Sequence, residues 1–112
     1  MKYTWENVPK NVPVWGCAYD VNNDNMYNYL RKEPVLGIVK ENERNKYRTL
    51  DVFYELNKKG EIKKSSKVYV YSRQYADTYE ECVELYNSLI DKALKDLEEV
   101  KKYHEQNKIE VL

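Results

Sequence analysis

The side chains that most often perform covalent chemistry are scarce in this chain. Histidine occurs once, as His104, and cysteine twice, as Cys17 and Cys82. A cysteine nucleophile is usually activated by a nearby base, and His104 stands far from both cysteines in the sequence. The chain also lacks a G-x-S-x-G elbow, a phosphate-binding loop and a dinucleotide fingerprint. The sequence therefore predicts that the protein is not an enzyme and uses no cofactor.

A calcium loop is the metal site that residue spacing comes closest to. Asp20, Asn22 and Asp24 occupy positions 1, 3 and 5 of an EF-hand loop. Position 6 is Asn25 where the turn needs glycine, and position 12 is Arg31 where the ion needs a bidentate glutamate. A zinc site would have to take its ligands from one His, two Cys and carboxylates, and these residues lack the spacing of zinc-binding motifs. We expect no metal, and instead an Asx-rich turn before a short helix over residues 26–32.

Binding is better supported than catalysis, because the chain holds 12 tyrosines beside one phenylalanine. A tyrosine ring packs while its hydroxyl bonds, and rings beside an arginine can stack on a planar group or hold a peptide. The period of two along strands places such residues on shared faces. The predicted binding residues are Trp15, Tyr19, Phe53, Tyr69, Tyr71, Arg73 and Tyr75. The alternative is that a helix covers this face and buries the rings as core.

A long helix is predicted over residues 78–106. Thr78 can cap its start, with Glu81 three residues on completing a capping box, and Asp77 with Glu80 is an equally spaced alternative. Such a helix spans roughly 40 Å at ~1.5 Å per residue, whereas a small domain is about 30 Å across. Its last turns would then project and pair with a second copy. The residues predicted for self-association are Ala93, Leu97, Val100 and Tyr103. Alternatively, the helix lies along its own sheet or breaks near Leu94.

The segments before this helix read as strands. Alternating or continuous apolar residues predict strands over 12–19, 34–41, 47–57 and 67–73, and Asn57 to Gly60 predicts a hairpin turn. We expect one α+β domain, a small curved antiparallel sheet of four or five strands or an SH3-like barrel, followed by one long C-terminal α-helix. Its parts are an N-terminal arm over 1–11 docked by Trp5, a β-rich core over 12–74, the helix and a tail over 107–112.

Charge, cysteine use and the lack of long apolar segments together indicate the partners and the compartment of the protein. Acidic and basic residues balance at 19 each, so nucleic acid is not an expected partner. The two cysteines show no metal or redox spacing and are expected to be reduced core residues, with a disulfide between them as the alternative. Neither a signal peptide nor an apolar run of ~18 residues is seen, so we expect a cytoplasmic protein that does not enter a membrane.

Residues 72–87, SRQYADTYEECVELYN, together with PVLGIV and KVYVYS, give the chain a family likeness. Over residues 12–106 it resembles small uncharacterised proteins of Firmicutes bacteriophages and mobile elements, in which a compact β domain precedes one long helix. The matching motifs concern packing and capping, so no catalytic residue is carried over. The resemblance implies a protein of the host cytoplasm that acts by binding host or defence proteins, or nucleotide messengers of defence systems.

The sequence is therefore compatible with three alternative functions. The first is a phage-type inhibitor, an anti-defence or host-takeover factor that binds a protein partner. The second is a protein that sequesters a nucleotide-like ligand, cyclic ones included, between aromatic rings and Arg31, Arg48 or Arg73. The third is a small carboxylate-dependent hydrolase using acids such as Glu80 and Glu81, although acids at a helix start primarily serve its dipole.

Overall fold

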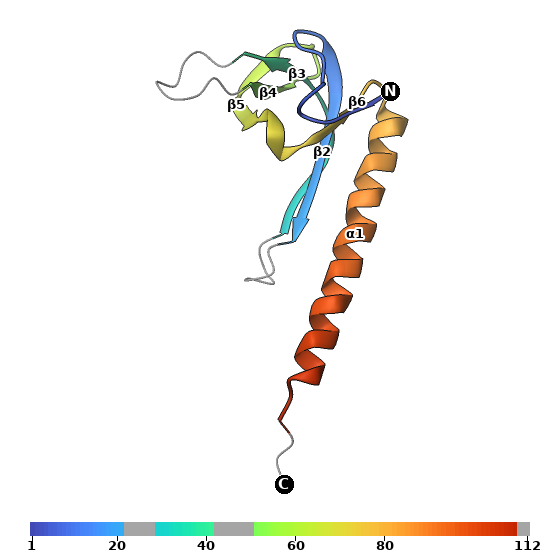
Figure 1. Cartoon of the computed structure of the whole chain (residues 1–112). Coiled ribbons are helices and arrows are strands. Elements are labelled where there is room, and N and C mark those ends of the chain that lie inside the picture. Colours follow the sequence, from blue (N-terminus) through green and yellow to red (C-terminus); the bar gives the residue numbers. More distant parts are fainter. Residues whose placement is uncertain (22–28, 42–50, 110–112) are drawn as a thin grey trace.

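An open, curved antiparallel sheet and one long C-terminal helix make up the protein, which confirms the predicted α+β class (Figure 1). The computed structural model describes residues 1–21, 29–41 and 51–109, with the side chains of 19–21, 29–32 and 64–66 outside the description. The elements are β1 (Lys2–Tyr3), β2 (Pro13–Val21), β3 (Tyr29–Lys40), β4 (Val52–Leu56), β5 (Ile62–Tyr69), the 3₁₀ turn η1 (Val70–Ser72), β6 (Gln74–Ala76) and α1 (Tyr79–Gln106).

Sheet order is β1-β6-β2-β3-β4-β5, which leaves β1 and β5 as the edges of an open sheet rather than the joined strands of a barrel. Strands β2 to β5 form a meander in chain order. The last strand, β6, instead enters between β1 and β2, with Tyr75 opposite Tyr3 on one side and Gly16 on the other. The strand that leads into α1 is therefore held on both sides by the sheet.

The β2–β3 hairpin is longer than predicted. Residues 29–32 belong to β3, where Tyr29 pairs with Val21 and Arg31 with Tyr19. The helix predicted over 26–32 is therefore wrong for 29–32, because pairing with β2 satisfies this backbone and overrides its weak local helix preference; residues 22–28 lie outside the description. The register shifts between Gly16 and Ala18, beside Pro34, a residue that cannot donate to the ladder.

The predicted turn between β4 and β5 is confirmed. Leu56 pairs with Ile62, and Gly60 has a φ of 79°, a conformation that glycine adopts at little cost. The side-chain oxygen of Asn57 accepts hydrogen bonds from the backbone N–H groups of Lys59 and Glu61, both at 2.9 Å. The turn chemistry is local, so the sequence was sufficient to predict it.

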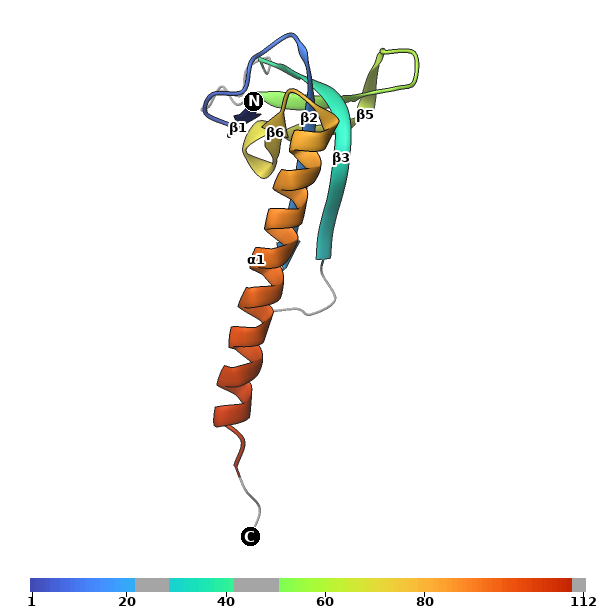
Figure 2. The same ribbon diagram turned by 90° about the vertical axis from the view of Figure 1, so that its right-hand side faces the viewer.

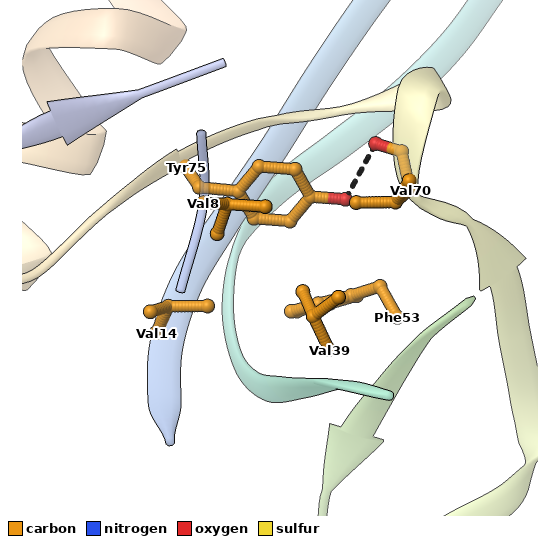
Figure 3. Packing of buried hydrophobic residues seen from close by; sticks show 6 residues of the cluster. All are labelled: Val8, Val14, Val39, Phe53, Val70 and Tyr75. Atoms are coloured by element: carbon orange, nitrogen blue, oxygen red, sulfur yellow. Dashed lines mark hydrogen bonds between the residues drawn. The ribbon is translucent and has the colours of Figure 1, made fainter. Parts of the chain in front are cut away.

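One hydrophobic core fills the curve of the sheet (Figure 3). It consists of Val8, Val14, Val39, Phe53, Val70 and Tyr75. The buried Tyr75 hydroxyl donates a hydrogen bond of 2.7 Å to the carbonyl of Val70, seen as the dashed line in Figure 3. A Cβ added to Gly37 would lie 2.3 Å from the Phe53 ring, so the backbone of β3 must pass this ring without a side chain.

A second core lies where α1 packs on β2 and β6. It is formed by Cys17, Ala76, Cys82 and Tyr86, with Trp15, Leu85, Leu89 and Ile90 around it. The helix starts beside β6 and runs along the β2–β3 hairpin, and its C-terminal turns continue beyond the described part of that hairpin (Figures 1 and 2). Thr78 caps α1 as predicted, since its side chain accepts the N–H of Glu81 at 3.2 Å.

The N-terminal arm is held by different residues from the one predicted. Trp5 is 51% exposed, so it does not dock the arm. Val8 is buried in the first core, and the Tyr3 hydroxyl lies 2.9 Å from a carboxylate oxygen of Asp77. A turn around Thr4 to Asn7 points Trp5 outward, and the flanking residues fix the arm instead.

Candidate functional site

The turn η1 separates the aromatic residues that were predicted to share one strand face. Strand β5 ends at Tyr69, and the 3₁₀ turn over Val70–Ser72 interrupts the alternation of side chains before β6 begins. Tyr69 and Tyr71 are consequently exposed, whereas Arg73 and Tyr75 are buried. The predicted face therefore divides into an outer pair and an inner group.

Tyr69 and Tyr71 form the outer group, here called the tyrosine pair. Their ring centres are 5.7 Å apart and their planes differ by 5°, so the rings are stacked. Tyr69 is 46% exposed and Tyr71 is 54% exposed. The Ser72 hydroxyl donates a hydrogen bond of 2.7 Å to the carbonyl of Tyr69 and closes the turn that carries both rings. The result is a pair of parallel, exposed rings on a hydrogen-bonded turn.

The inner group surrounds a buried cation. The guanidinium carbon of Arg73 lies 5.1 Å from the centre of the Phe53 ring, within the range of a cation–π contact. Its Nη1 atom is buried and has no hydrogen-bond partner. Burial lowers the pKa of Arg73, while the nearby Tyr75, Glu55 and cysteine side chains act in the opposite direction. Phe53 and Tyr75 are fully buried core residues and offer no surface to a ligand.

Strand β2 contributes differently from the prediction that Trp15 and Tyr19 act together. The Trp15 ring lies against Tyr79 of α1, with centres 5.1 Å apart and an angle of 69°. Trp15 therefore helps to seat the helix on the sheet. The side chain of Tyr19 lies outside the description, as do those of Arg31 and Arg48.

The two cysteines meet across the second core, which their spacing in the sequence gave no signal for. Both are unpaired by disulfide and completely buried. The Cys17 thiol donates to the carbonyl oxygen of Cys82 at 3.6 Å. Interaction between the two thiols lowers the pKa of Cys17 and raises the pKa of Cys82. The positive charge of Arg73 lowers the pKa of both thiols, which for Cys82 offsets only part of the rise.

The C-terminal half of α1 carries exposed apolar side chains. Leu97 and Val100 are half-buried and lie along one stripe, with Leu94 on one side of it at 57% exposure and Tyr103 on the other at 63%. These four residues are here called the distal helix surface. Ala93, which was predicted to join them in self-association, is buried within the single chain and is not available for a second contact. Leu94 was not among the predicted residues.

Residues 1–21, 29–41 and 51–109 hold no group of three or more His, Cys, Asp or Glu side chains placed to bind a metal ion. In the same residues no helix combines the length and hydrophobicity that a membrane crossing requires. The calcium loop considered for residues 20–31 falls largely outside these ranges.

Comparison of the chain with protein-family models, curated proteins and solved structures finds no match. The resemblance to small proteins of phages and mobile elements therefore stays a prediction. Function must be inferred from the surfaces that this fold exposes and from the groups that it buries.

Proposed function

We propose that the protein acts by binding a protein partner through the tyrosine pair and covering part of the partner's surface. The observation that carries this proposal is the parallel stacking of two exposed rings on a hydrogen-bonded turn. Tyrosine is enriched among the residues that dominate protein–protein binding energy. Rings that already stack on each other lose less conformational freedom on binding than isolated rings, which favours affinity.

An inhibitor is the role that best fits such a surface. The tyrosine pair can cover a partner's functional site, and the sparse nucleophiles of the chain give it little means of chemical turnover. Together with the predicted phage resemblance, this supports an anti-defence or host-takeover factor that works in the host cytoplasm. The carboxylate-dependent hydrolase is less favoured, since Glu81 is engaged by the Met1 ammonium group and the Thr78 hydroxyl.

A nucleotide-like ligand is the second candidate, because a base could stack on the open side of the tyrosine pair. Its weakness among the described side chains, which leave out those of Arg31 and Arg48, is the phosphate contact. Arg73, predicted to supply that contact, is only 8% exposed and lies over Phe53. A protein partner requires no such cation and is therefore favoured.

Self-association through the distal helix surface completes the proposal. Two copies related by a twofold axis present the same surface to each other, and an antiparallel arrangement would set Leu97 of one copy opposite Val100 of the second. Leu94 and Tyr103 would then lie at the borders of the contact. Such a dimer carries two tyrosine pairs and would bind a multivalent target with increased avidity.

The partner contact is tested by affinity capture from host lysate, followed by calorimetry with the purified partner. We expect Tyr71→Ala to raise the dissociation constant about tenfold or more, equivalent to ~1.4 kcal/mol. Trp5→Ala is the matched control, since Trp5 is a similarly exposed aromatic residue on the N-terminal arm. Equal affinity for both variants would refute the role of the tyrosine pair. Stabilisation by nucleotides in a thermal shift assay, lost in Tyr71→Ala, would favour the second candidate.

The dimer is tested by light scattering of the full chain. We expect the mass of two chains for the wild type and of one chain for Leu97→Glu, because the new carboxylate would be buried without a partner. Lys95→Glu changes an exposed position away from the stripe and should remain dimeric. A wild-type mass of one chain at all concentrations would refute self-association without affecting the tyrosine pair.

A further inference from the structure

The joint between sheet and helix contains two neighbouring cysteines in one buried cluster. Cys17 lies in β2 and Cys82 in the first turns of α1, and both side chains have no exposed surface. The Cys17 thiol donates to the carbonyl oxygen of Cys82 at 3.6 Å, and both residues belong to the second core. An S–S bond is ~2.05 Å long, so two neighbouring cysteines of one core can form it after a local movement that brings the two sulfurs together.

Arg73 places a buried positive charge beside these thiols. Its Nη1 atom is buried without a hydrogen-bond partner, and its charge acts on both cysteines. A buried nitrogen without a hydrogen-bond partner is costly. A thiolate nearby would add a favourable negative charge, and reactive cysteines are typically found next to such cations.

We propose that Cys17 and Cys82 form a redox-sensitive pair, in which Cys17 is the attacking thiolate, Cys82 the resolving thiol and Arg73 the residue that favours the thiolate. A hydroperoxide is the oxidant. The Cys17 thiolate attacks the peroxide oxygen, the O–O bond breaks, and Cys17 becomes a sulfenic acid as the departing oxygen takes a proton and leaves as water or an alcohol. The Cys82 thiol then attacks the Cys17 sulfur, its proton leaves with the hydroxyl as water, and the disulfide forms. The two thiols lose two electrons in total, and the peroxide gains them.

Access to the buried thiols controls the reaction. Because neither sulfur is exposed, the oxidant reaches Cys17 only when α1 lifts away from β2 locally. Once formed, the disulfide joins β2 to α1 across 65 positions of sequence and prevents that lifting. Oxidation would therefore fix α1 against β2, and reduction would release it.

The first test treats the full chain with hydrogen peroxide. We expect a loss of about 2 Da per chain, reversible by a dithiol reductant, and a peptide pair linking Cys17 to Cys82. The melting temperature should rise on the order of 10 °C, since the cross-link closes a long loop. Cys82→Ser should instead accumulate a sulfenic acid on Cys17. A disulfide between chains, or full resistance of both native thiols to oxidation, would overturn the proposal.

The second test separates the charge of Arg73 from its packing. The rate of Cys17 oxidation is measured against pH in the wild type and in Arg73→Met. We expect the rate to reach half its maximum at a higher pH in the variant, because the favouring charge is gone. The other groups facing this region, Cys82, Tyr86, Tyr75 and Glu55, are unchanged in both proteins. An identical midpoint would remove Arg73 from the mechanism, whatever its effect on stability.

Discussion

The guanidinium of Arg73 and the ring of Phe53 are stacked inside the protein, with 5.1 Å between the guanidinium carbon and the ring centre. Phe53 is fully buried and Arg73 nearly so, yet the Nη1 atom of Arg73 makes no hydrogen bond. The ring contact compensates only part of the lost hydration, because a cation–π contact contributes about 2 kcal/mol when desolvated. The surrounding fold therefore keeps Arg73 buried, and Arg73 itself adds little to the stability of the fold.

Replacing this buried charge should increase stability. Arg73→Met keeps a long unbranched side chain against Phe53 and removes the charge, so we expect the free energy of unfolding to rise by about 1–2 kcal/mol. Arg73→Lys should lower it, because the compact ammonium group is more strongly hydrated. Urea unfolding measures both variants. A loss of stability in Arg73→Met would show that the guanidinium is a net stabilising group.

The hydroxyl of Tyr75 is expected to stabilise the first core. Its hydrogen bond to the carbonyl of Val70 is 2.7 Å long and buried. Tyr75→Phe leaves that carbonyl without its partner, which should reduce the free energy of unfolding by about 1–3 kcal/mol. Tyr71→Phe is the control, since its exposed hydroxyl can bond to water, and a change within about 0.5 kcal/mol is expected. Similar losses for both variants in chemical denaturation would contradict the prediction.

Gly37 is required by the close approach of β3 to Phe53. An added Cβ would lie 2.3 Å from the Phe53 ring and 2.5 Å from the backbone oxygen of Tyr54. We expect Gly37→Ala to cost about 1–3 kcal/mol or more, because both ring and strand must move. Gly60→Ala should cost about 1 kcal/mol, from its positive φ alone, since nothing lies within 4 Å of the added atom. Thermal unfolding distinguishes the two, and a smaller loss at position 37 than at 60 would argue against the clash.

Thr78 is expected to contribute through capping of α1. Its side chain accepts the N–H of Glu81, and its hydroxyl donates to a Glu81 carboxylate oxygen at 2.9 Å. Thr78→Ala should lower the free energy of unfolding by about 1 kcal/mol, whereas Thr78→Ser should change it by a few tenths. Helix content by circular dichroism during unfolding reports the loss. Equal stability of the alanine and serine variants would mean that water caps the helix as well.

Acid should weaken the start of α1 through Glu81. The Met1 ammonium group first, and the Thr78 hydroxyl second, hold the pKa of Glu81 below its ordinary value of 4.5. Because the folded protein binds this proton less readily than the unfolded chain, the contribution of Glu81 is complete above that value. It is lost as the pH falls through the lower folded pKa. Stability measured from pH 7 to 3 should fall less steeply for Glu81→Gln, and matching slopes would contradict this assignment.

Features written in neighbouring residues were predictable from the sequence. The start of α1 depends on Thr78 and Glu81, three positions apart, and the β4–β5 turn depends on Asn57 and Gly60. Apolar spacing likewise indicated the length of the helix, because the stripe from Cys82 onward continues without glycine or proline. In each case the stabilising contact forms within a few residues.

Features that depend on distant pairing were not predictable. The alternation of Tyr69, Tyr71 and Arg73 suggested one strand face, but η1 intervenes so that β6 can reach its place beside β2. Residues 29–32 join a strand because β2 offers them partners. The contact of Cys17 with Cys82 likewise arises only when α1 packs on the sheet. Period-based reasoning cannot anticipate such crossings.

The insertion of β6 between β1 and β2 has a consequence for synthesis at the ribosome. Strand β1 pairs with β6, which ends at Ala76, so the amino-terminal strand must wait for that segment to leave the exit tunnel. The meander from β2 to β5 can assemble earlier, because its partners follow one another along the chain. Translation therefore delivers β1 before β6, the strand with which it pairs. The β1–β6 side of the sheet is completed last.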